Sequence, residues 1–303
     1  MTTEPETVLR RPPPRETLEW ARRAIGERSR IVGVETLFGG ISHANHGLDI
    51  ADESGSVQRV VIRRWARPDW EVTDPEYTPA QEVATYGLIA ASAVPAPRLI
   101  AADVTGDACD VPAILVTRIE GTPGGEWQDD PTFTTQLAAA VPLIQAVDPE
   151  RARLIVPPYR PYYTASMLEP PSWAKHPDVW EQAITISTGR EPDAPACFIH
   201  RDYHPENTIW RAGRLVGIVD WTSASWGPPQ IDLAHMRVNL AADIGVDAAD
   251  AFLAAYRALD GSFDYDPFWD IRGVIDFISD LDTEGHLLDP LEALVIAAVA
   301  ALG

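Results

Sequence analysis

The chain has 303 residues, of which 46% are hydrophobic and 23% charged, and this suits one large globular domain or two smaller ones. The formal net charge of −21 argues against binding to nucleic acid, which requires a basic face. The sequence has no run of about 18 apolar residues and no apolar signal core at its start, so we expect no membrane partner and a cytoplasmic protein.

The negative charge is concentrated near the end of the sequence. From Asp220 to Gly303 there are fifteen Asp or Glu residues against three Arg, a net charge of −12. Two interpretations remain open: a solvated acidic surface, or an acidic pocket for a cationic substrate. Under the second, the candidate contacts are Asp243, Asp276, Asp280 and Asp282.

The first part of the chain is rich in short β-forming runs. We expect a disordered tail over residues 1–13 and a short amphipathic helix over 16–25. Five strands should then follow, because turn signals such as Asp52-Glu53-Ser54-Gly55 separate apolar runs. These strands are expected at residues 31–38, 46–51, 57–65, 98–102 and 114–119, with a helix over 79–91. Residues 14–119 are therefore predicted to form a small β-rich N-terminal lobe.

After a hinge near residues 117–121 the chain becomes mainly helical. A helix is expected over 133–147, where Pro142 predicts a kink or two shorter helices and Asp148-Pro149 marks the end. The remaining expected elements are a helix near 179–186, β runs at 196–200, 208–211 and 215–220, and three or four helices from residue 231. The predicted fold class is α+β, with residues 120–303 as the larger C-terminal lobe.

One motif carries most of the chemical information. His200, Asp202 and Asn207 lie in the run Phe198–Asn207, and Asp220 ends an apolar stretch thirteen positions later. Phosphoryl transfer needs a carboxylate beside the attacking hydroxyl and oxygen ligands for magnesium. His-Arg-Asp, four residues and Asn also match the catalytic-loop pattern of kinases. The alternative is a chance hairpin with an N-capping aspartate and a core histidine.

On these residues the sequence resembles the aminoglycoside phosphotransferase and choline kinase superfamily, and the resemblance covers nearly the whole chain. It implies a bilobal, protein-kinase-like fold, a magnesium cofactor, and ATP or GTP as phosphate donor. It also implies that Asp202 is the catalytic base and that Asn207 and Asp220 are the metal ligands. Asp232 matches a family acid that braces the catalytic loop, and His200 is expected to support that loop.

The N-terminal lobe is expected to hold the nucleotide. Gly39, Gly40 and Ser42 lie between two predicted strands, where glycines let backbone N–H groups approach phosphate oxygens; the alternative is a simple hairpin turn. Val116 and Arg118 stand where the hinge of the family meets the nucleotide base, although an ordinary edge strand would look the same.

Arg63 occupies the strand position at which protein kinases carry a phosphate-binding lysine, and Glu82 on the next helix is its natural partner. Strand alternation puts Arg63 and Arg64 on opposite faces, and Val61 shares the face of Arg63, which favours Arg63 as the inward residue. Because a guanidinium binds phosphate in a bidentate manner, the chemistry survives the change from lysine. The alternative is an ordinary pair of surface arginines.

Several positions depart from related patterns. Position 201 is Arg, where many phosphotransferases carry Gly, and Asp220 is followed by Trp221-Thr222. Only twelve positions separate Asp220 from Asp232, and no Ala-Pro-Glu follows, which leaves no room for the activation segment that a protein substrate requires. His204, inside the catalytic loop, is expected to pack rather than to act.

The sequence therefore predicts a small-molecule O-phosphotransferase acting on a hydroxylated substrate, with an antibiotic such as an aminoglycoside or macrolide as one candidate class. The alternatives are a metabolic hydroxyl kinase of the choline, homoserine or sugar type and an inactive nucleotide-binding module. The sequence leaves the oligomeric state open.

Overall fold

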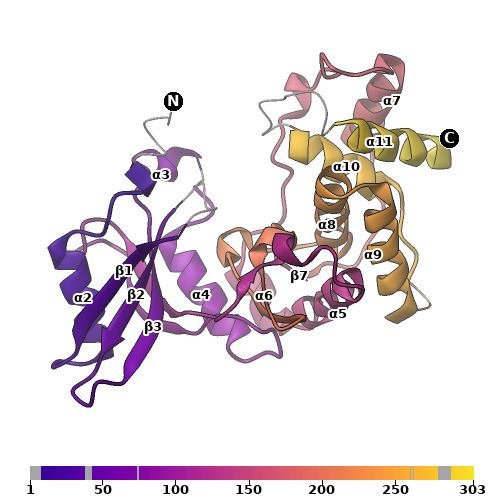
Figure 1. The fold of residues 1–303 in the computed structure, drawn as a ribbon. Helices are drawn as coiled ribbons and strands as arrows, with labels where there is room; N and C mark the ends of the chain where they lie inside the picture. The colour runs from indigo at the N-terminus through magenta and orange to yellow at the C-terminus, as the bar shows by residue number, and fades with distance from the viewer. Residues whose placement is uncertain (1–7, 38–42, 74, 260, 262, 279–287) are drawn as a thin grey trace. The chain divides into compact units, whose positions relative to one another are not determined.

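The computed structural model describes residues 8–37, 43–73, 75–259, 261, 263–278 and 288–303. The chain divides into two compact units (Figure 1). Unit 1 contains Met1–Glu120 and Gly217–Thr222, and unit 2 contains Gly121–Val216 and Ser223–Gly303. The lobes expected from the sequence divide near the same point, but the short segment that carries Asp220 returns to unit 1.

Unit 1 is built on a five-stranded sheet with the order β1-β2-β3-β5-β4, in which all neighbours are antiparallel. Its strands are β1 (Arg30–Thr36), β2 (Ala44–Ala51), β3 (Val57–Arg64), β4 (Leu99–Asp103) and β5 (Ala113–Thr117). The predicted turn between β2 and β3 is confirmed: the Asp52 carboxylate accepts the N–H groups of Ser54 and Ser56, and Gly55 adopts a positive φ of 85°. All five predicted strands are present.

The two faces of this sheet have different roles. Alternation along β2 and β3 puts Leu48, Ile50, Val60 and Ile62 on one face, where they form a core with Ala21 of α2 (Arg15–Ile25). Figure 1 shows α2 and α4 (Pro79–Ile89) on opposite sides of the sheet. The face that α2 leaves uncovered is therefore the one that carries Arg63.

Helix α4 begins where the sequence predicts it, because Thr78 caps it by accepting the N–H of Gln81 and Pro79 occupies its first turn. A further single turn, α3 (Trp70–Thr73), was not predicted. Residues 8–13 differ from the predicted disordered tail. Leu9 is buried, and the Arg11 carbonyl accepts a hydrogen bond from Arg64 at 2.7 Å, so this segment packs on unit 1.

Unit 2 is mainly helical. Its helices are α5 (Phe133–Gln145), α6 (Pro149–Ile155), α7 (Pro177–Thr188), α8 (Gln230–Asp243), α9 (Val246–Leu259), α10 (Phe268–Ile278) and α11 (Asp289–Leu302). Helix α8 lies at the centre, with contacts to α9, α10 and α11. Eleven of its fourteen residues are buried.

Short strands complete unit 2. β7 (Cys197–Ile199) pairs antiparallel with β10 (Ser225–Gly227). β6 (Thr122–Pro123), β8 (Thr208–Arg211) and β9 (Arg214–Ile218) form a second small sheet in the order β6-β8-β9. Single 3₁₀ turns occur at 124–127, 165–167, 205–207 and 221–223. The chain crosses from unit 2 to unit 1 within β9.

The structure corrects one prediction about the helices. Asp148-Pro149 was expected only to end α5, but it also begins α6: the Asp148 side chain accepts the N–H groups of Glu150 and Arg151, and Pro149 stands at the first helical position. Pro142 lies inside a single continuous helix. Among the described residues, every helix is too short or too polar to cross a lipid bilayer.

We predict that one buried ion pair accounts for much of the stability of unit 2. Arg237 of α8 donates to both carboxylate oxygens of Asp270 on α10, at 2.8 and 3.0 Å, and both side chains are buried. R237M should lower the free energy of unfolding by about 3–5 kcal/mol, because it leaves the Asp270 charge buried and unpaired.

The matched control is R190M, which removes an arginine from the exposed pair with Asp193. It should leave the melting temperature unchanged, because an exposed ion pair contributes little. Calorimetric melting of both variants measures the difference, and equal melting temperatures would contradict the prediction.

Candidate functional site

The loop between β7 and β8 is held by a carboxylate of α8. Asp232 is fully buried and accepts the backbone N–H of His200 at 2.9 Å and that of Arg201 at 2.7 Å. Burial raises the pKa of Asp232 to about 6, although the two amide donors act to lower it. The predicted loop residues and the predicted brace are therefore in direct contact.

Arg201 has a backbone conformation that arginine disfavours. Its φ is 70°, in the left-handed region that glycine adopts without cost and that other residues rarely adopt. Its buried guanidinium lies 3.7 Å from the centre of the Tyr162 ring and donates to the Arg160 carbonyl. These side-chain contacts offset the backbone strain.

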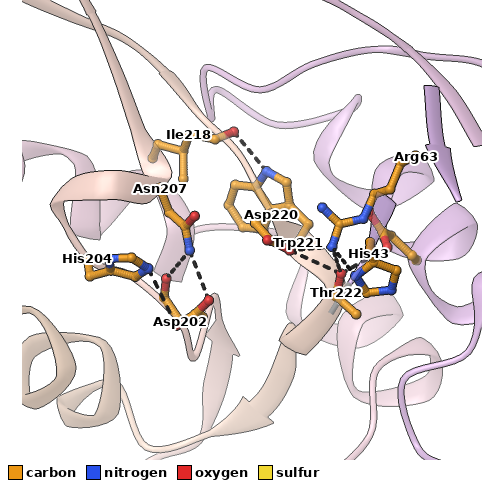
Figure 2. A network of polar contacts seen from close by, with 10 residues as sticks. His43, Arg63, Asp202, His204, Asn207, Ile218, Asp220, Trp221 and Thr222 are labelled. Atoms are coloured by element: carbon orange, nitrogen blue, oxygen red, sulfur yellow. Dashed lines mark hydrogen bonds and ion pairs between the residues drawn. The ribbon is translucent and has the colours of Figure 1, made fainter. Parts of the chain in front are cut away.

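Asp202 and Asn207 form a hydrogen-bonded pair. The side-chain nitrogen of Asn207 donates to Oδ2 of Asp202 at 2.9 Å and to the backbone carbonyl of Asp202 at 2.9 Å, as Figure 2 shows. Because its nitrogen makes both contacts, Asn207 is left with its amide oxygen to bind a further group. Asp202 itself remains 36% exposed, so a second molecule could reach its carboxylate.

Two histidines lie beside the same carboxylate. Nε2 of His235, on α8, is 3.1 Å from Oδ1 of Asp202, and Nε2 of His204 is 3.7 Å from that oxygen. Burial acts to raise the pKa of Asp202, but the hydrogen bond from His235 and the nearby histidine charges hold it well below its usual range. Asp202 is therefore an ionised group.

Sequence analysis missed His235 and treated His204 only as a packing residue. A signal was present: His235 follows Asp232 by three positions, and residues three apart share one face of a helix. A helix that braces the loop with Asp232 therefore also presents His235 to it.

Unit 1 carries a second polar cluster. The guanidinium of Arg63 lies 3.3 Å from the Glu82 carboxylate and donates to Oδ1 of Asp220 at 2.6 Å. Arg63 and Glu82 are both buried. The alternative that Arg63 belongs to an ordinary pair of surface arginines is therefore wrong. Burial raises the pKa of Glu82 to about 7 against the opposing effect of Arg63. The predicted partnership between strand β3 and helix α4 is present.

Arg64, on the opposite face, is also buried and pairs with Asp110 at 2.6 Å.

Two further residues complete this cluster. The Thr222 hydroxyl contacts Arg63 and lies 3.0 Å from Glu82 and 3.1 Å from Asp220. Nδ1 of His43 is 2.9 Å from the Arg63 guanidinium, which can only donate, so this nitrogen accepts and the ring is neutral (Figure 2). Burial, followed by the charge of Arg63, lowers the pKa of His43 well below its ordinary value. Neither residue was selected from the sequence.

Asp220 has a φ of 64°, a second left-handed position in a non-glycine residue. The neighbouring Trp221 is buried, and its indole N–H donates to the Ile218 carbonyl at 3.0 Å, which closes the turn. Strained backbone of this kind is common at functional sites.

The donor atoms present suit magnesium. The amide oxygen of Asn207, in unit 2, and the carboxylate of Asp220, in unit 1, are each hard oxygen donors of the kind that magnesium prefers. Within the described ranges, no group of three or more His, Cys, Asp or Glu residues is arranged to hold a metal ion.

Of the predicted nucleotide contacts, Gly39, Gly40 and Ser42 lie outside the described residues. Val116 is buried in β5, paired with Val61 and Leu99. Arg118 pairs with Glu35 at 2.7 Å, and its guanidinium lies against the backbone of β2: a Cβ added at Gly47 would be 2.7 Å from Nη1. A larger residue at position 47 would therefore displace the end of the Arg118 side chain.

Comparison with known families gives a single clear result. The model of the phosphotransferase enzyme family matches residues 50–268, which is more than half of the chain and includes every described residue of both clusters except His43. No curated protein matches the sequence.

Solved structures show the same fold at low sequence identity. A candidate aminoglycoside phosphotransferase from Ralstonia eutropha JMP134 is 14% identical with a TM-score of 0.62, over 96% of this chain and 99% of that one. The aminoglycoside phosphotransferase APH(4)-Ia, in a ternary complex with ADP and hygromycin B, is 13% identical with a TM-score of 0.60, over 89% and 94%. Macrolide 2′-phosphotransferase MphH from Brachybacterium faecium is 19% identical with a TM-score of 0.53, over 89% and 91%. The predicted α+β, kinase-like fold is confirmed.

The strain at Arg201 generates a prediction. R201A should lower both the melting temperature and the turnover, because alanine retains the left-handed strain and loses the contacts with Tyr162 and Arg160. R201G should be more stable than R201A by about 1 kcal/mol, since glycine adopts this conformation freely. Thermal melting of both variants tests this, and an R201A protein as stable as R201G would contradict it.

The buried histidines of unit 1 predict sensitivity to acid. Burial lowers the pKa of His46, on β2, from 6.5 to about 4, so below pH 6.5 the unfolded chain binds more protons at this position than the folded chain. The stabilising contribution is therefore present above pH 6.5 and is lost as the pH falls towards 4. H46Q should flatten the dependence of melting temperature on pH in this window, and an unchanged slope would refute the assignment.

Proposed function

The chain belongs to the phosphotransferase enzyme family, and we propose that it transfers the γ-phosphate of ATP or GTP to a hydroxyl group of a small molecule. The observation that carries the proposal is the pairing of Asp202 with Asn207: the side-chain amide of Asn207 anchors an ionised, accessible carboxylate. The ternary complexes of APH(4)-Ia with nucleotide and hygromycin B support both a nucleotide donor and a small hydroxylated acceptor.

In this proposal Asp202 accepts a hydrogen bond from the acceptor hydroxyl and orients its oxygen towards the γ-phosphorus. The oxygen–phosphorus bond forms, the bond to the β–γ bridging oxygen breaks, and the hydroxyl proton passes to Asp202 while the nucleoside diphosphate leaves. A carboxylate with so low a pKa is a weak base, but phosphoryl transfer through a loose transition state depends mainly on positioning and charge stabilisation.

The remaining residues have supporting roles. Asn207 and Asp220 would hold magnesium, which when bound neutralises charge on the phosphate oxygens. Arg63 would contact the phosphates, and Glu82 would fix its orientation through the ion pair at 3.3 Å. The Thr222 hydroxyl lies within hydrogen-bonding distance of the carboxylates of Glu82 and Asp220 and helps to hold them beside Arg63.

For the acceptor we propose a cationic, antibiotic-like compound, supported by the net charge of −21 and by the aminoglycoside and macrolide phosphotransferases of the same fold. Asp243 is exposed and open to such a ligand. Asp276 is not: it is buried and accepts hydrogen bonds from Tyr159 and Tyr162. Asp280 and Asp282 lie outside the described residues.

The test is a coupled assay of nucleoside diphosphate release with magnesium and a panel of aminoglycosides, macrolides, choline, homoserine and sugars. A compound-dependent rate should appear, and D202A should lower turnover by about 10²–10⁴-fold while nucleotide affinity stays within about twofold.

The control variant is D193A, which removes an exposed carboxylate in unit 2. Preference for choline, homoserine or a sugar would replace the antibiotic-like acceptor with a metabolic one. Turnover by D202A at the wild-type rate would refute the role of Asp202. Nucleotide binding without turnover on any compound would favour an inactive binding module.

A further inference from the structure

Helix α8 meets the catalytic loop at two levels. In its first turn, Asp232 accepts the backbone N–H groups of His200 and Arg201. One turn further on, His235 reaches the side chain of Asp202, with Nε2 at 3.1 Å from Oδ1. One face of a single helix therefore fixes both the backbone of the loop and the carboxylate that the loop carries.

In the hydrogen bond between His235 and Asp202, the histidine is the donor and the carboxylate is the acceptor. An ionised carboxylate can only accept, so the proton of the His235 ring must lie on Nε2. His204 approaches the same oxygen only to 3.7 Å, beyond hydrogen-bonding distance, so it cannot replace His235.

A carboxylate anchored at one oxygen is poorly oriented, because the terminal torsion of aspartate is broad. Asn207 anchors Oδ2 at 2.9 Å, and His235 anchors Oδ1. Two donors on two oxygens fix the plane of the group and leave its remaining lone pairs in defined directions. His235 is well suited to this because it comes from a helix whose residues are mostly buried and is itself 17% exposed.

We infer that His235 is a positioning residue for phosphoryl transfer: it holds the Asp202 carboxylate in the orientation that receives the acceptor hydroxyl. The inference rests on the proposed function and deepens it, since it adds to the site a residue that acts through Asp202. Its loss should therefore change turnover and leave both Michaelis constants nearly unaltered.

The experiment compares three substitutions at one position. H235L removes the donor. H235Q places an amide N–H at about the distance of Nε2, and H235N, which is shorter, places one at about the distance of Nδ1 and so cannot reach Asp202. We expect kcat to fall about 10- to 100-fold in H235L and H235N, which is the loss of one hydrogen bond to a charged group. H235Q should retain at least about one third of the wild-type kcat, and KM for nucleotide and acceptor should stay within about twofold in all three.

Nucleotide affinity and melting temperature, measured for each variant, separate this effect from misfolding, and H176Q serves as a control because His176 is exposed on unit 2. A wild-type kcat in H235L would overturn the inference, and so would equal losses in H235Q and H235N. D202A, measured in parallel, tests the proposed function separately. If D202A is inactive and H235L is not, only the role of His235 fails; if D202A is fully active, the proposed function itself fails.

Discussion

The geometry of the candidate site depends on one buried carboxylate. Asp232 accepts two consecutive backbone N–H groups, those of His200 and Arg201, at the point where the chain leaves β7. Two amide donors on one acceptor fix the direction of the backbone there, and buried N–H groups need such partners in any case. The loop thus sets where Asp202 stands, and the contacts of its side chain with Asn207 and His235 set how the carboxylate is oriented.

A comparable constraint operates in unit 1, although its chemistry is different. Arg63 is buried beside Glu82, Asp220 and Thr222, so the cost of removing a guanidinium from water is offset by two carboxylates and a hydroxyl. The turn at Asp220 adopts a left-handed conformation, as does Arg201 in the other cluster. Arg201 adjoins the proposed functional carboxylate of Asp202, and Asp220 is itself a proposed functional carboxylate. Such positions are expected where local strain is retained for function.

Much of the fold and part of the candidate site could be predicted from the sequence because local signals were strong. Turn signals between β-forming runs identified the strands, the kinase pattern indicated the partnership of Arg63 with Glu82, and strand alternation favoured Arg63 over Arg64 as the inward residue. Other features depend on tertiary contacts that a local pattern reports only in part. His235 approaches Asp202 only because α8 packs at the centre of unit 2, and His43 reaches Arg63 across two paired strands. Asp148-Pro149 was misjudged for a different reason, because an aspartate followed by proline can end one helix and begin the next.

The pKa values of the carboxylates explain why positioning must dominate in this site. Burial raises the pKa of Asp232 to about 6 and that of Glu82 to about 7, whereas Asp202 is held far below its usual range by the donors and positive charges around it. The only one of the three that is accessible is thus the weakest base. A group of this kind gains little by accepting a proton early in the reaction. In the proposed reaction its value would lie in a fixed negative charge with defined lone-pair directions, which would align a hydroxyl before transfer and receive the proton once the oxygen–phosphorus bond has formed. The neighbouring donors that make Asp202 a weak base are the same groups that make it a well-oriented one.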